Sequence, residues 1–176
     1  MKLKSLDGCR LKIGKYPPFT YNAYGGGGKA KFLTNQKSHL LSISFSSKSF
    51  AIPPLTSKTT KFLFFPLPPC FKIEMSMDKL EGTIDQNSGK VSLTFESKFL
   101  FSIGTMLKFP ELIVKTLLKT GKVKSKLHYG EGLPLQDNGT TKLVGISIIP
   151  KTGNKILDTF LGLPNEALAE LQCEIK

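Results

Sequence analysis

The chain has 176 residues, of which 40% are hydrophobic and 22% charged, so it is expected to form one folded domain and not a disordered chain. The longest apolar run, residues 62–71, has ten residues including three prolines. A membrane-spanning helix needs about 20 apolar residues, so no transmembrane segment is predicted. Three cysteines and two histidines are too few and too scattered for a disulfide framework or a structural zinc site. No metal or cofactor is therefore expected.

The net charge of +12 lies almost entirely in the front of the chain. Residues 1–73 contain twelve Lys or Arg and one acid, a net +11, whereas residues 74–176 contain thirteen Lys and twelve acids, a net +1. Three interpretations of the basic front stay open. It is an organelle-targeting segment, a nucleic-acid surface, or a set of strands whose lysines face solvent.

Nucleic acid is the less favoured partner of this basic front. Arg10 is the only arginine in the chain, and base and phosphate recognition relies on the planar guanidinium fork that lysine lacks. Stacking groups are nevertheless present among the lysines, and we consider them the candidate nucleic-acid contacts. They are Tyr16, Phe19, Tyr21 and Tyr24.

The beginning of the chain is expected to be the least ordered part. We predict a loose basic segment over residues 1–15 and a single β-rich domain over residues 16–176. The glycine run 25–28 is not a phosphate-binding loop, because Ala23 and Ala30 stand where that motif needs glycine and Ser or Thr. A flexible turn between two short strands is predicted there instead.

From residue 40 onward the dominant hydrophobic period is two, which predicts half-buried strands. Alternation is clean over residues 41–45, 71–77 and 91–101, and a loop over 85–89 separates the last strand from residues 80–84. The two runs around that loop form a predicted β-hairpin. Lysines of residues 48–72 then face outward.

The second half of the chain contains the predicted helices. One or two short helices are expected, and the first candidate, residues 111–119, allows a helix or a strand. A second short helix is predicted over 153–162, after the cap Asn154. Further strands are expected at the alternating segments 122–129, 142–149 and 171–175, with Asp137-Asn138-Gly139 as a tight turn.

Together these elements predict a mainly antiparallel β fold, either a sandwich or a flattened barrel. A short internal sequence similarity, which we call the internal echo, suggests two similar β-halves. Both copies run from a proline through Thr and Lys to Phe-Leu-x-x-Pro and then to a strand, over residues 54–75 and 150–175. Chance similarity is the competing explanation.

No arrangement of residues indicates catalysis, and no catalytic, cofactor-binding or metal-binding residue is assigned. His128 is expected on the lysine-bearing face of its strand and His39 among polar residues, neither beside a nucleophile. Cys70 and Cys173 are expected to be small buried hydrophobic residues. The remaining candidates are ordinary solvated carboxylate pairs, Glu81 with Asp85 and Glu170 with Glu174.

Phenylalanine is unusually abundant, with thirteen Phe and no Trp. Phe95, Phe99 and Phe101 share one face of the clearest strand. This face belongs to a filled core or lines a cavity for an apolar ligand, and pattern alone leaves both alternatives open.

Four stretches resemble a plant chloroplast protein family with cyanobacterial relatives whose function is uncharacterised. They are Phe19-Thr-Tyr-Asn-Ala-Tyr-Gly-Gly-Gly-Gly28, Ile52-Pro-Pro-Leu-Thr-Ser-Lys-Thr-Thr-Lys-Phe-Leu63, Pro66-Leu-Pro-Pro69 and Phe160-Leu-Gly-Leu-Pro164. The resemblance spans most of residues 16–176 and implies a nuclear-encoded plastid protein. Residues 1–15 depart from what this resemblance implies, because they are too short and too lysine-rich for a typical transit peptide.

Three functions are carried forward from the sequence. The first is a non-enzymatic plastid module for binding or assembly, with an apolar small molecule or a protein as partner. The second is a basic peripheral module on nucleic acid or anionic lipid. The third, an enzyme without a recognisable motif, requires a cleft with converging polar groups around His128.

Overall fold

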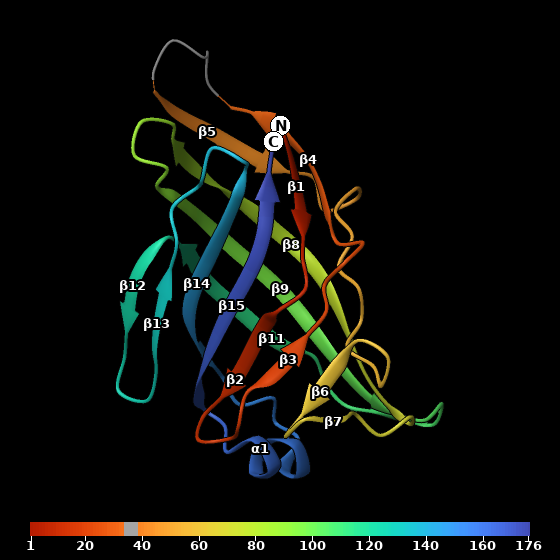
Figure 1. Ribbon diagram of the computed structural model, residues 1–176. Helices are drawn as coiled ribbons and strands as arrows, with labels where there is room; N and C mark the ends of the chain where they lie inside the picture. Colours follow the sequence, from red (N-terminus) through yellow and green to blue (C-terminus); the bar gives the residue numbers. More distant parts are fainter. Residues whose placement is uncertain (34–38) are drawn as a thin grey trace.

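The computed structural model describes residues 1–33 and 39–176, which form an antiparallel β structure with one α-helix (Figure 1). The strands of the first half are β1 (Lys2–Ser5), β2 (Cys9–Ile13), β3 (Phe19–Tyr21), β4 (Gly27–Phe32), β5 (Leu40–Phe45), β6 (Thr60–Phe62), β7 (Phe65–Pro66) and β8 (Phe71–Asp85). Those of the second half are β9 (Val91–Ile103), β10 (Leu107–Lys108), β11 (Leu112–Lys119), β12 (Gly121–Lys124), β13 (Tyr129–Gly132), β14 (Thr140–Ile149) and β15 (Asn165–Ile175). The helix is α1 (Lys155–Leu161).

Eight of these strands close into a barrel. Around the wall they follow the order β1, β4, β5, β8, β9, β11, β14 and β15, and β15 returns to β1 where Leu3 pairs with Ile175. Pairing between the first and last strands leaves no free edge at this point of the sheet. The predicted mainly antiparallel β fold is therefore confirmed, and the closed ring selects its barrel form.

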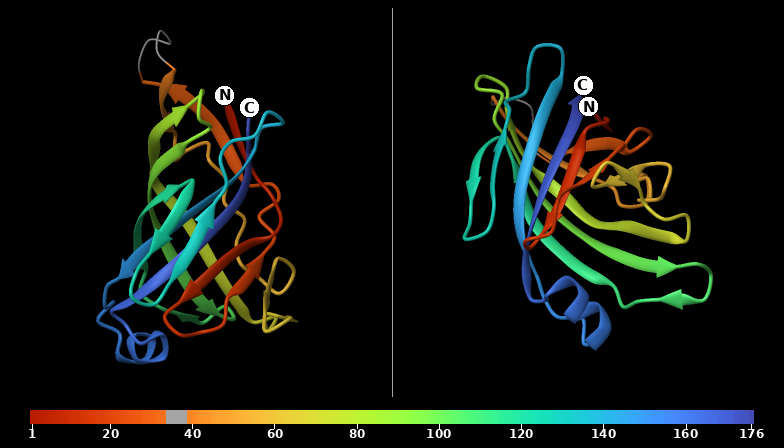
Figure 2. Two further views of the ribbon diagram at one scale, coloured as in Figure 1. Left: turned by 60° about the vertical axis from the view of Figure 1, so that its left-hand side comes forward. Right: turned by 60° about the horizontal axis from the view of Figure 1, so that its bottom comes forward.

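A second run of strands forms part of the wall at one end of the barrel. β2 continues along β15, pairing Arg10 with Glu170 and Ile13 with Ala167, and β3, β6 and β7 follow it in the sheet. A bridge between Leu55 and Ile73 brings this run back to β8. Between β15 and β8, the wall thus consists of β1, β4 and β5 at one end and of β2, β3 and β6 at the other (Figure 2).

The end of the barrel that holds β1 and β5 has a filled interior, which we call the packed half. It is defined by five side chains with no exposed surface, Leu3, Ile43, Ile84, Leu93 and Leu143. They come from five different strands, and each belongs to the inward-facing set of its alternating sequence. Burial of such side chains contributes about 1.5–3 kcal/mol each, which makes this half the main source of stability.

The strands predicted from alternation are present. Residues 41–45 lie in β5 and residues 91–101 in β9, while the runs 71–77 and 80–84 join into the single long strand β8. The join has a physical cause, because the pairing of β8 with β9 shifts register between Met77 and Lys79. This irregularity lets both Met77 and Leu80 face the interior despite their odd spacing.

The helix predicted over 153–162 is confirmed as α1. The Asn154 side chain accepts a hydrogen bond from the Leu157 backbone N–H, as an N-cap does, and Gly162 closes the helix in the left-handed conformation. The candidate helix over 111–119 is wrong. That segment is β11, paired with β9 from Leu112 to Lys119, because cross-strand pairing outweighs the weak helical spacing of its leucines.

Two other local predictions are also wrong. Residues 1–15, predicted to be loose, contain β1 and β2, since the barrel needs β1 to bridge β15 and β4. The strand predicted over 122–129 is instead the hairpin of β12 and β13, with a turn at residues 125–128. The hairpin lies on the outer face of the barrel, where Gly130 approaches Leu168 of β15. Consequently His128, which was expected on the lysine-bearing face of a strand, is buried, while Leu127 and Tyr129 are exposed.

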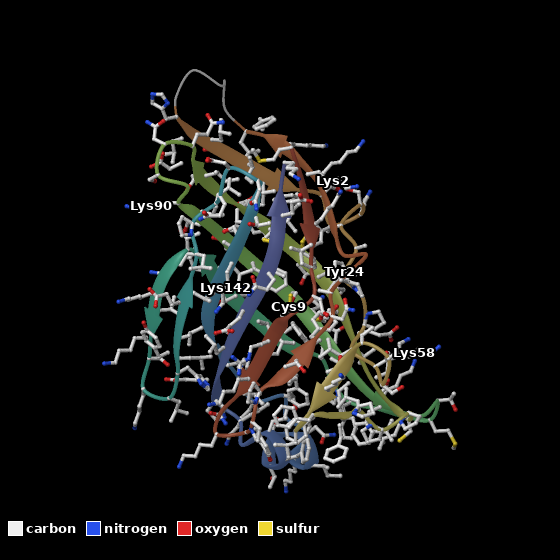
Figure 3. All side chains as sticks on the ribbon, in the orientation of Figure 1. Lys2, Cys9, Tyr24, Lys58, Lys90 and Lys142 are labelled. Atoms are coloured by element: carbon white, nitrogen blue, oxygen red, sulfur yellow. The ribbon has the colours of Figure 1, made fainter. Side chains whose placement is uncertain are left out.

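The two copies of the internal echo have different structures. Phe62-Leu63 lies at the β6–β7 hairpin, whereas Phe160-Leu161 lies in α1. The lysines of residues 48–72 are exposed, as expected for outward-facing positions, and Figure 3 shows Lys2, Lys58 and Lys90 projecting from the outer surface.

Candidate functional site: an apolar cavity

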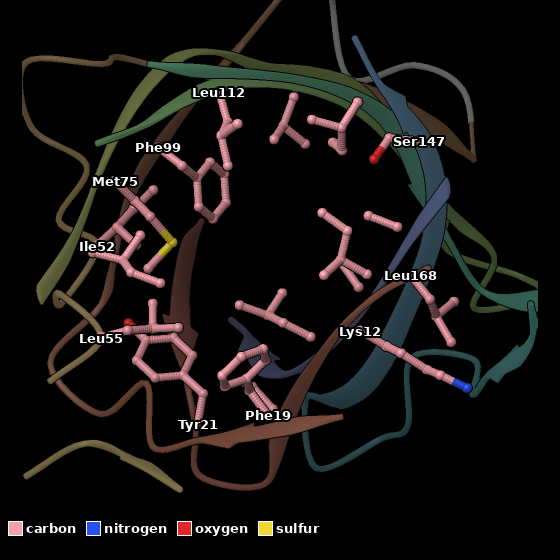
Figure 4. A pocket seen from close by; sticks show the side chains of 18 of the residues that line it. Lys12, Phe19, Tyr21, Ile52, Leu55, Met75, Phe99, Leu112, Ser147 and Leu168 are labelled. Atoms are coloured by element: carbon pink, nitrogen blue, oxygen red, sulfur yellow. The ribbon is translucent and has the colours of Figure 1, made fainter. Parts of the chain in front are cut away.

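A cavity of about 470 Å³ occupies the end of the barrel that holds β2, β3 and α1, which we call the hollow half. Figure 4 shows Phe19 and Tyr21 of β3, Met75 of β8 and Phe99 of β9 around the same space. Volumes in this range are those of pockets that hold small ligands. The interior of the hollow half is therefore large enough for a molecule beyond solvent size.

Phenylalanine dominates the cavity wall. Eight of the thirteen Phe side chains line it. These are Phe19, Phe50, Phe62, Phe71, Phe95, Phe99, Phe101 and Phe160. The inward-facing side chains of β8 and β9 in this region, such as Phe71 and Phe99, are only half-buried, whereas those of the packed half are fully buried.

Both interpretations of the phenylalanine-bearing strand therefore hold, for different parts of it. On the inward face of β9, Val91 and Leu93 are buried in the packed core. Further along the same face, Phe95, Phe99 and Phe101 line the cavity. The strand passes from a filled interior to a hollow one within about ten residues, a distance of ~33 Å along an extended chain.

Polar groups in the cavity wall are few. Ser147 of β14 directs its hydroxyl toward the space in Figure 4, and the neighbouring Thr116 hydroxyl donates to the backbone carbonyl of Ile146 at 3.1 Å. The hydroxyls of Tyr16 and Tyr21 donate to the backbone carbonyls of Phe160 and Pro53. With those donors engaged within the protein, Ser147 stands out as a group for an oxygen of a ligand.

Two titratable groups of the wall, Cys9 and Tyr21, are held neutral by burial. Burial raises the pKa of the Cys9 thiol to about 11, and it also raises the pKa of the Tyr21 phenol above its ordinary value. Lys12 and Glu170 border the cavity, but both also border a second cavity of about 220 Å³ outside β2 and β15. Near-neutral pH therefore leaves Cys9 and Tyr21 uncharged, which suits an uncharged ligand.

The backbone of the β6–β7 turn, beside the cavity, is strained. Phe62 pairs with Phe65, so Leu63 and Phe64 are the two central residues of the hairpin loop. Both have positive φ, 50° and 70°, a combination that belongs to type I′ turns and strongly favours Asn-Gly. Holding bulky residues there costs of order 1–3 kcal/mol each. The two side chains project into solvent, Phe64 with 96% of its surface exposed.

The polar groups around His128 meet without forming a catalytic arrangement. Glu166 accepts hydrogen bonds from the Ser125 hydroxyl at 2.6 Å and from the Leu127 N–H at 2.9 Å. These hydrogen bonds lower the pKa of the Glu166 carboxyl, and the bond from the Ser125 hydroxyl has the largest effect. The His128 Nε2 lies 3.1 Å from the Glu166 backbone carbonyl, and its Nδ1 is buried without a partner. No imidazole nitrogen contacts the Ser125 hydroxyl, and neither cavity reaches His128. The cluster anchors the β12–β13 hairpin to β15.

The other residues singled out by sequence are scattered over the fold. His39 is exposed, and Cys70 is also exposed, so the expectation that Cys70 is buried is wrong. Cys173 is buried as expected, in the packed half. The carboxylates that were predicted as pairs instead form ion pairs with surface lysines or accept hydrogen bonds within a turn. Glu81 pairs with Lys79, Glu170 with Lys142 and Glu174 with Lys176, while Asp85 accepts from Asn87 and Ser88 in the hairpin loop.

The glycine run is a turn, as predicted, but its second half continues into β4. Gly27 has φ +118°, and a Cβ there would lie 2.0 Å from the Leu3 carbonyl oxygen. Glycine is needed because β4 crosses so close to β1 at the point where the barrel closes. In the described ranges, no group of His, Cys, Asp and Glu could hold a metal ion.

Sequence reasoning missed two contributions to the cavity. β2 and β3 supply Leu11 and Phe19, and α1 supplies Leu157 and Phe160 at one end. The available signal was the surplus of Phe over every other aromatic residue, which exceeds what one core strand needs. No local pattern indicates that these segments face one another.

Within residues 1–33 and 39–176, no helix is long and apolar enough to cross a membrane. Searches of protein-family models, characterised proteins and solved structures find no match for this chain. The geometry of the cavity is consequently the basis for inferring function.

Proposed function

We propose that this protein is a non-enzymatic binding module that holds an apolar small molecule inside the hollow half of its barrel. The observation that carries the proposal is the cavity of about 470 Å³, walled by eight Phe side chains. A cavity of this size left without an occupant forfeits packing contacts that a filled core would make. An apolar ligand restores those contacts and gains the free energy of leaving water.

The chemistry of the wall supports an uncharged, largely hydrocarbon ligand with at most one or two oxygens. A charged headgroup in this cavity would have no buried partner of opposite sign, which is costly. The hydroxyl of Ser147 is the group suited to a ligand hydroxyl or carbonyl. Lipids of the isoprenoid or neutral glycerolipid class have this chemistry.

A protein partner and an enzymatic role receive less support. Eight of the thirteen Phe side chains line the cavity, a position that a protein-binding surface alone would not explain. The cluster of Ser125, His128 and Glu166 lacks both a cleft and a nucleophile–base contact. A plastid location remains a proposal that depends on the resemblance to the chloroplast family.

The proposal is tested by filling the cavity. Ala169 lies in its wall on β15, so Ala169→Phe places a ring in the space that the ligand needs. We expect native mass spectrometry of the purified wild-type chain to show a non-covalent lipid adduct, and the fluorescent probe N-phenyl-1-naphthylamine to bind competitively with it. Both signals are expected to be lost in Ala169→Phe.

The matched control is Ala51→Phe, which adds the same ring at an exposed position outside the cavity wall. It should keep the adduct and the probe signal. Equal probe binding by the wild type and by Ala169→Phe, with circular dichroism showing both folded, would contradict the proposal.

A second experiment tests the role of the Ser147 hydroxyl. Ser147→Ala is expected to weaken binding of an oxygenated lipid while leaving binding of a pure hydrocarbon unchanged.

A further inference from the structure

The hollow half ends in exposed apolar side chains that come from three separate segments, and we call this set the rim. It consists of Leu63, Phe64 and Phe65 at the β6–β7 hairpin, Met106 at the β9–β10 turn, and Ile156 and Phe160 on α1. Phe64 and Met106 are 96% and 95% exposed. So many large apolar side chains at the surface of one end indicate an interaction site.

The three segments lie at the same end of the barrel, around the cavity. In Figures 1 and 2, α1, the β6–β7 hairpin and the β9–β10 turn are all at the end away from the chain termini. The Gly104 N–H donates to the Cys70 carbonyl at 2.7 Å, which ties the β9–β10 turn to the segment after β7. Phe62, next to the hairpin tip, and Phe160 both line the cavity, and Phe160 is also 55% exposed. The cavity wall therefore reaches the surface within the rim.

The tip of the β6–β7 hairpin is a departure from ordinary turn chemistry. Leu63 and Phe64 occupy positive-φ positions where Asn-Gly would be relaxed. The Phe64 side chain gains almost no burial from this position, since 96% of its surface is exposed. Strain of this kind is typical of positions where function, not folding, determines the residue.

Cations flank each of the three segments. Lys61 precedes the hairpin tip, Lys108 follows the β9–β10 turn, and Lys155 begins α1. All three are exposed, and none makes an ion pair with an acid in the described part of the chain. Lysines just behind an apolar tip can keep their ammonium groups at the level of lipid headgroups while the tip inserts.

We propose that the rim docks onto the surface of a bilayer containing anionic lipid, with the mouth of the cavity facing the membrane. Separate projecting tips suit an acyl layer, which accepts each side chain without a matching pocket, and the unpaired lysines complement anionic headgroups. The role of this docking, transfer of the apolar ligand between membrane and cavity, rests on the proposed function. The proposal that the rim docks onto a bilayer does not depend on the proposed function.

Insertion of the tip is tested by fluorescence, since the chain contains no tryptophan. Phe64→Trp gives a protein with a single tryptophan at the rim, where the native side chain is 96% exposed, and Leu133→Trp gives one beyond the rim, at an apolar position that is 54% exposed. With vesicles of phosphatidylcholine and phosphatidylglycerol, the emission of Phe64→Trp should shift to the blue and that of Leu133→Trp should not. Identical responses from the two proteins would overturn the proposal.

Binding is tested by a variant that should not harm the fold. The double substitution Leu63→Asn with Phe64→Gly installs the turn sequence that the backbone favours, so its melting temperature should equal or exceed that of the wild type. Loss of two inserting apolar side chains should weaken vesicle binding by about tenfold or more in a sedimentation assay. Leu133→Asn serves as the control, because Leu133 is 54% exposed and Leu63 is 53% exposed. Unchanged binding by the double variant contradicts the proposal.

Further outcomes separate docking from ligand binding and from self-association. Binding to the anionic vesicles should weaken at high salt and on vesicles of phosphatidylcholine alone, because the lysine contribution is screened or removed. If the wild type binds N-phenyl-1-naphthylamine but no vesicles, the docking proposal fails and the proposed function stands.

If Ala169→Phe loses binding of the probe yet still binds vesicles, docking and ligand binding are independent, and the docking proposal stands. Concentration-dependent dimers that the double variant abolishes, without vesicle binding, would assign the rim to a second copy of the chain and overturn docking.

Discussion

The packed half and the hollow half are built from the same long strands, yet their interiors differ. On β8, Ile84 has no exposed surface, while Phe71 and Ile73 of the same inward-facing set remain half-buried beside the cavity. The difference follows from which strands complete the wall. β1, β4 and β5 bring aliphatic side chains together at one end, whereas the strands β2, β3 and β6 at the other end carry only a smaller buried cluster, which includes Cys9 and Tyr21, beside the cavity. A barrel can therefore concentrate its stability in one half and leave the other free to bind.

The largest expected effect contrasts the same deletion in the two halves. Leu93→Ala removes a fully buried side chain from the packed half and should lower the free energy of unfolding by about 2–5 kcal/mol. Leu112→Ala removes an identical side chain from the half-buried cavity wall, where less area is lost and no new void forms, and should cost about 1–2 kcal/mol. Urea unfolding of both variants measures the difference. Equal losses would mean that the cavity wall is as tightly packed as the core.

A smaller effect comes from adding volume in place of removing it. Cys173→Leu enlarges a residue with no exposed surface in the packed half and should destabilise the fold by about 1–3 kcal/mol through overpacking. Ala169→Leu adds a larger increment to the cavity wall and should be neutral or stabilising, because the new side chain occupies empty space. Thermal melts of the two proteins compare them. A drop in melting temperature for Ala169→Leu would show that the cavity is filled by the chain itself.

The smallest expected effect is on stability at alkaline pH. Burial raises the pKa of Cys9, in the hollow half, to about 11 and that of Cys173, in the packed half, to about 12, from the ordinary thiol value of 9.0. The unfolded chain therefore loses these protons first, so stability is fully present below about pH 9 and falls as pH rises toward the folded values. The decline contributed by Cys173 should continue after that of Cys9 has ended, because water is better excluded from the packed half.

Substitution of the thiols checks this assignment. Cys173→Ala and Cys9→Ala should each flatten the alkaline decline in unfolding free energy, and Cys70→Ala, at an exposed position, should leave it unchanged. Burial also raises the pKa of Tyr21, so a part of the decline should remain at higher pH in these variants. A decline that is unchanged in both the Cys9 and the Cys173 variant would contradict the assignment.

A large part of the fold was predictable because it depends on local pattern. Alternation over residues 41–45 and 91–101 identifies β5 and β9, and capping by Asn154 identifies α1. The sequence predicted the candidate site only as one of two alternatives. The Phe-bearing face of β9 indicated a core or a cavity, and no property of a single strand distinguishes them.

The errors share a physical origin in long-range pairing. Residues 112–119 have a weak helical stripe, but eight pairs with β9 make them β11. His128 was assigned to an exposed face because a continuous strand was assumed, and a hairpin that folds onto β15 buries it. Residues 2–5 carry little hydrophobic signal of their own, yet they close the barrel between β15 and β4.

What the sequence determined by itself is the direction of side chains and the kind of surface they make. On β5, β8 and β9, alternation separated the inward apolar side chains from the outward polar ones, since successive side chains of a strand point to opposite faces. Only the tertiary structure decided how far apart the inward faces stand. That distance depends on which strands complete the ring at each end, and these strands come from distant segments of the chain, as with the paired Leu3 and Ile175 near its two ends. The same apolar side chains therefore form a core at one end and a cavity at the other.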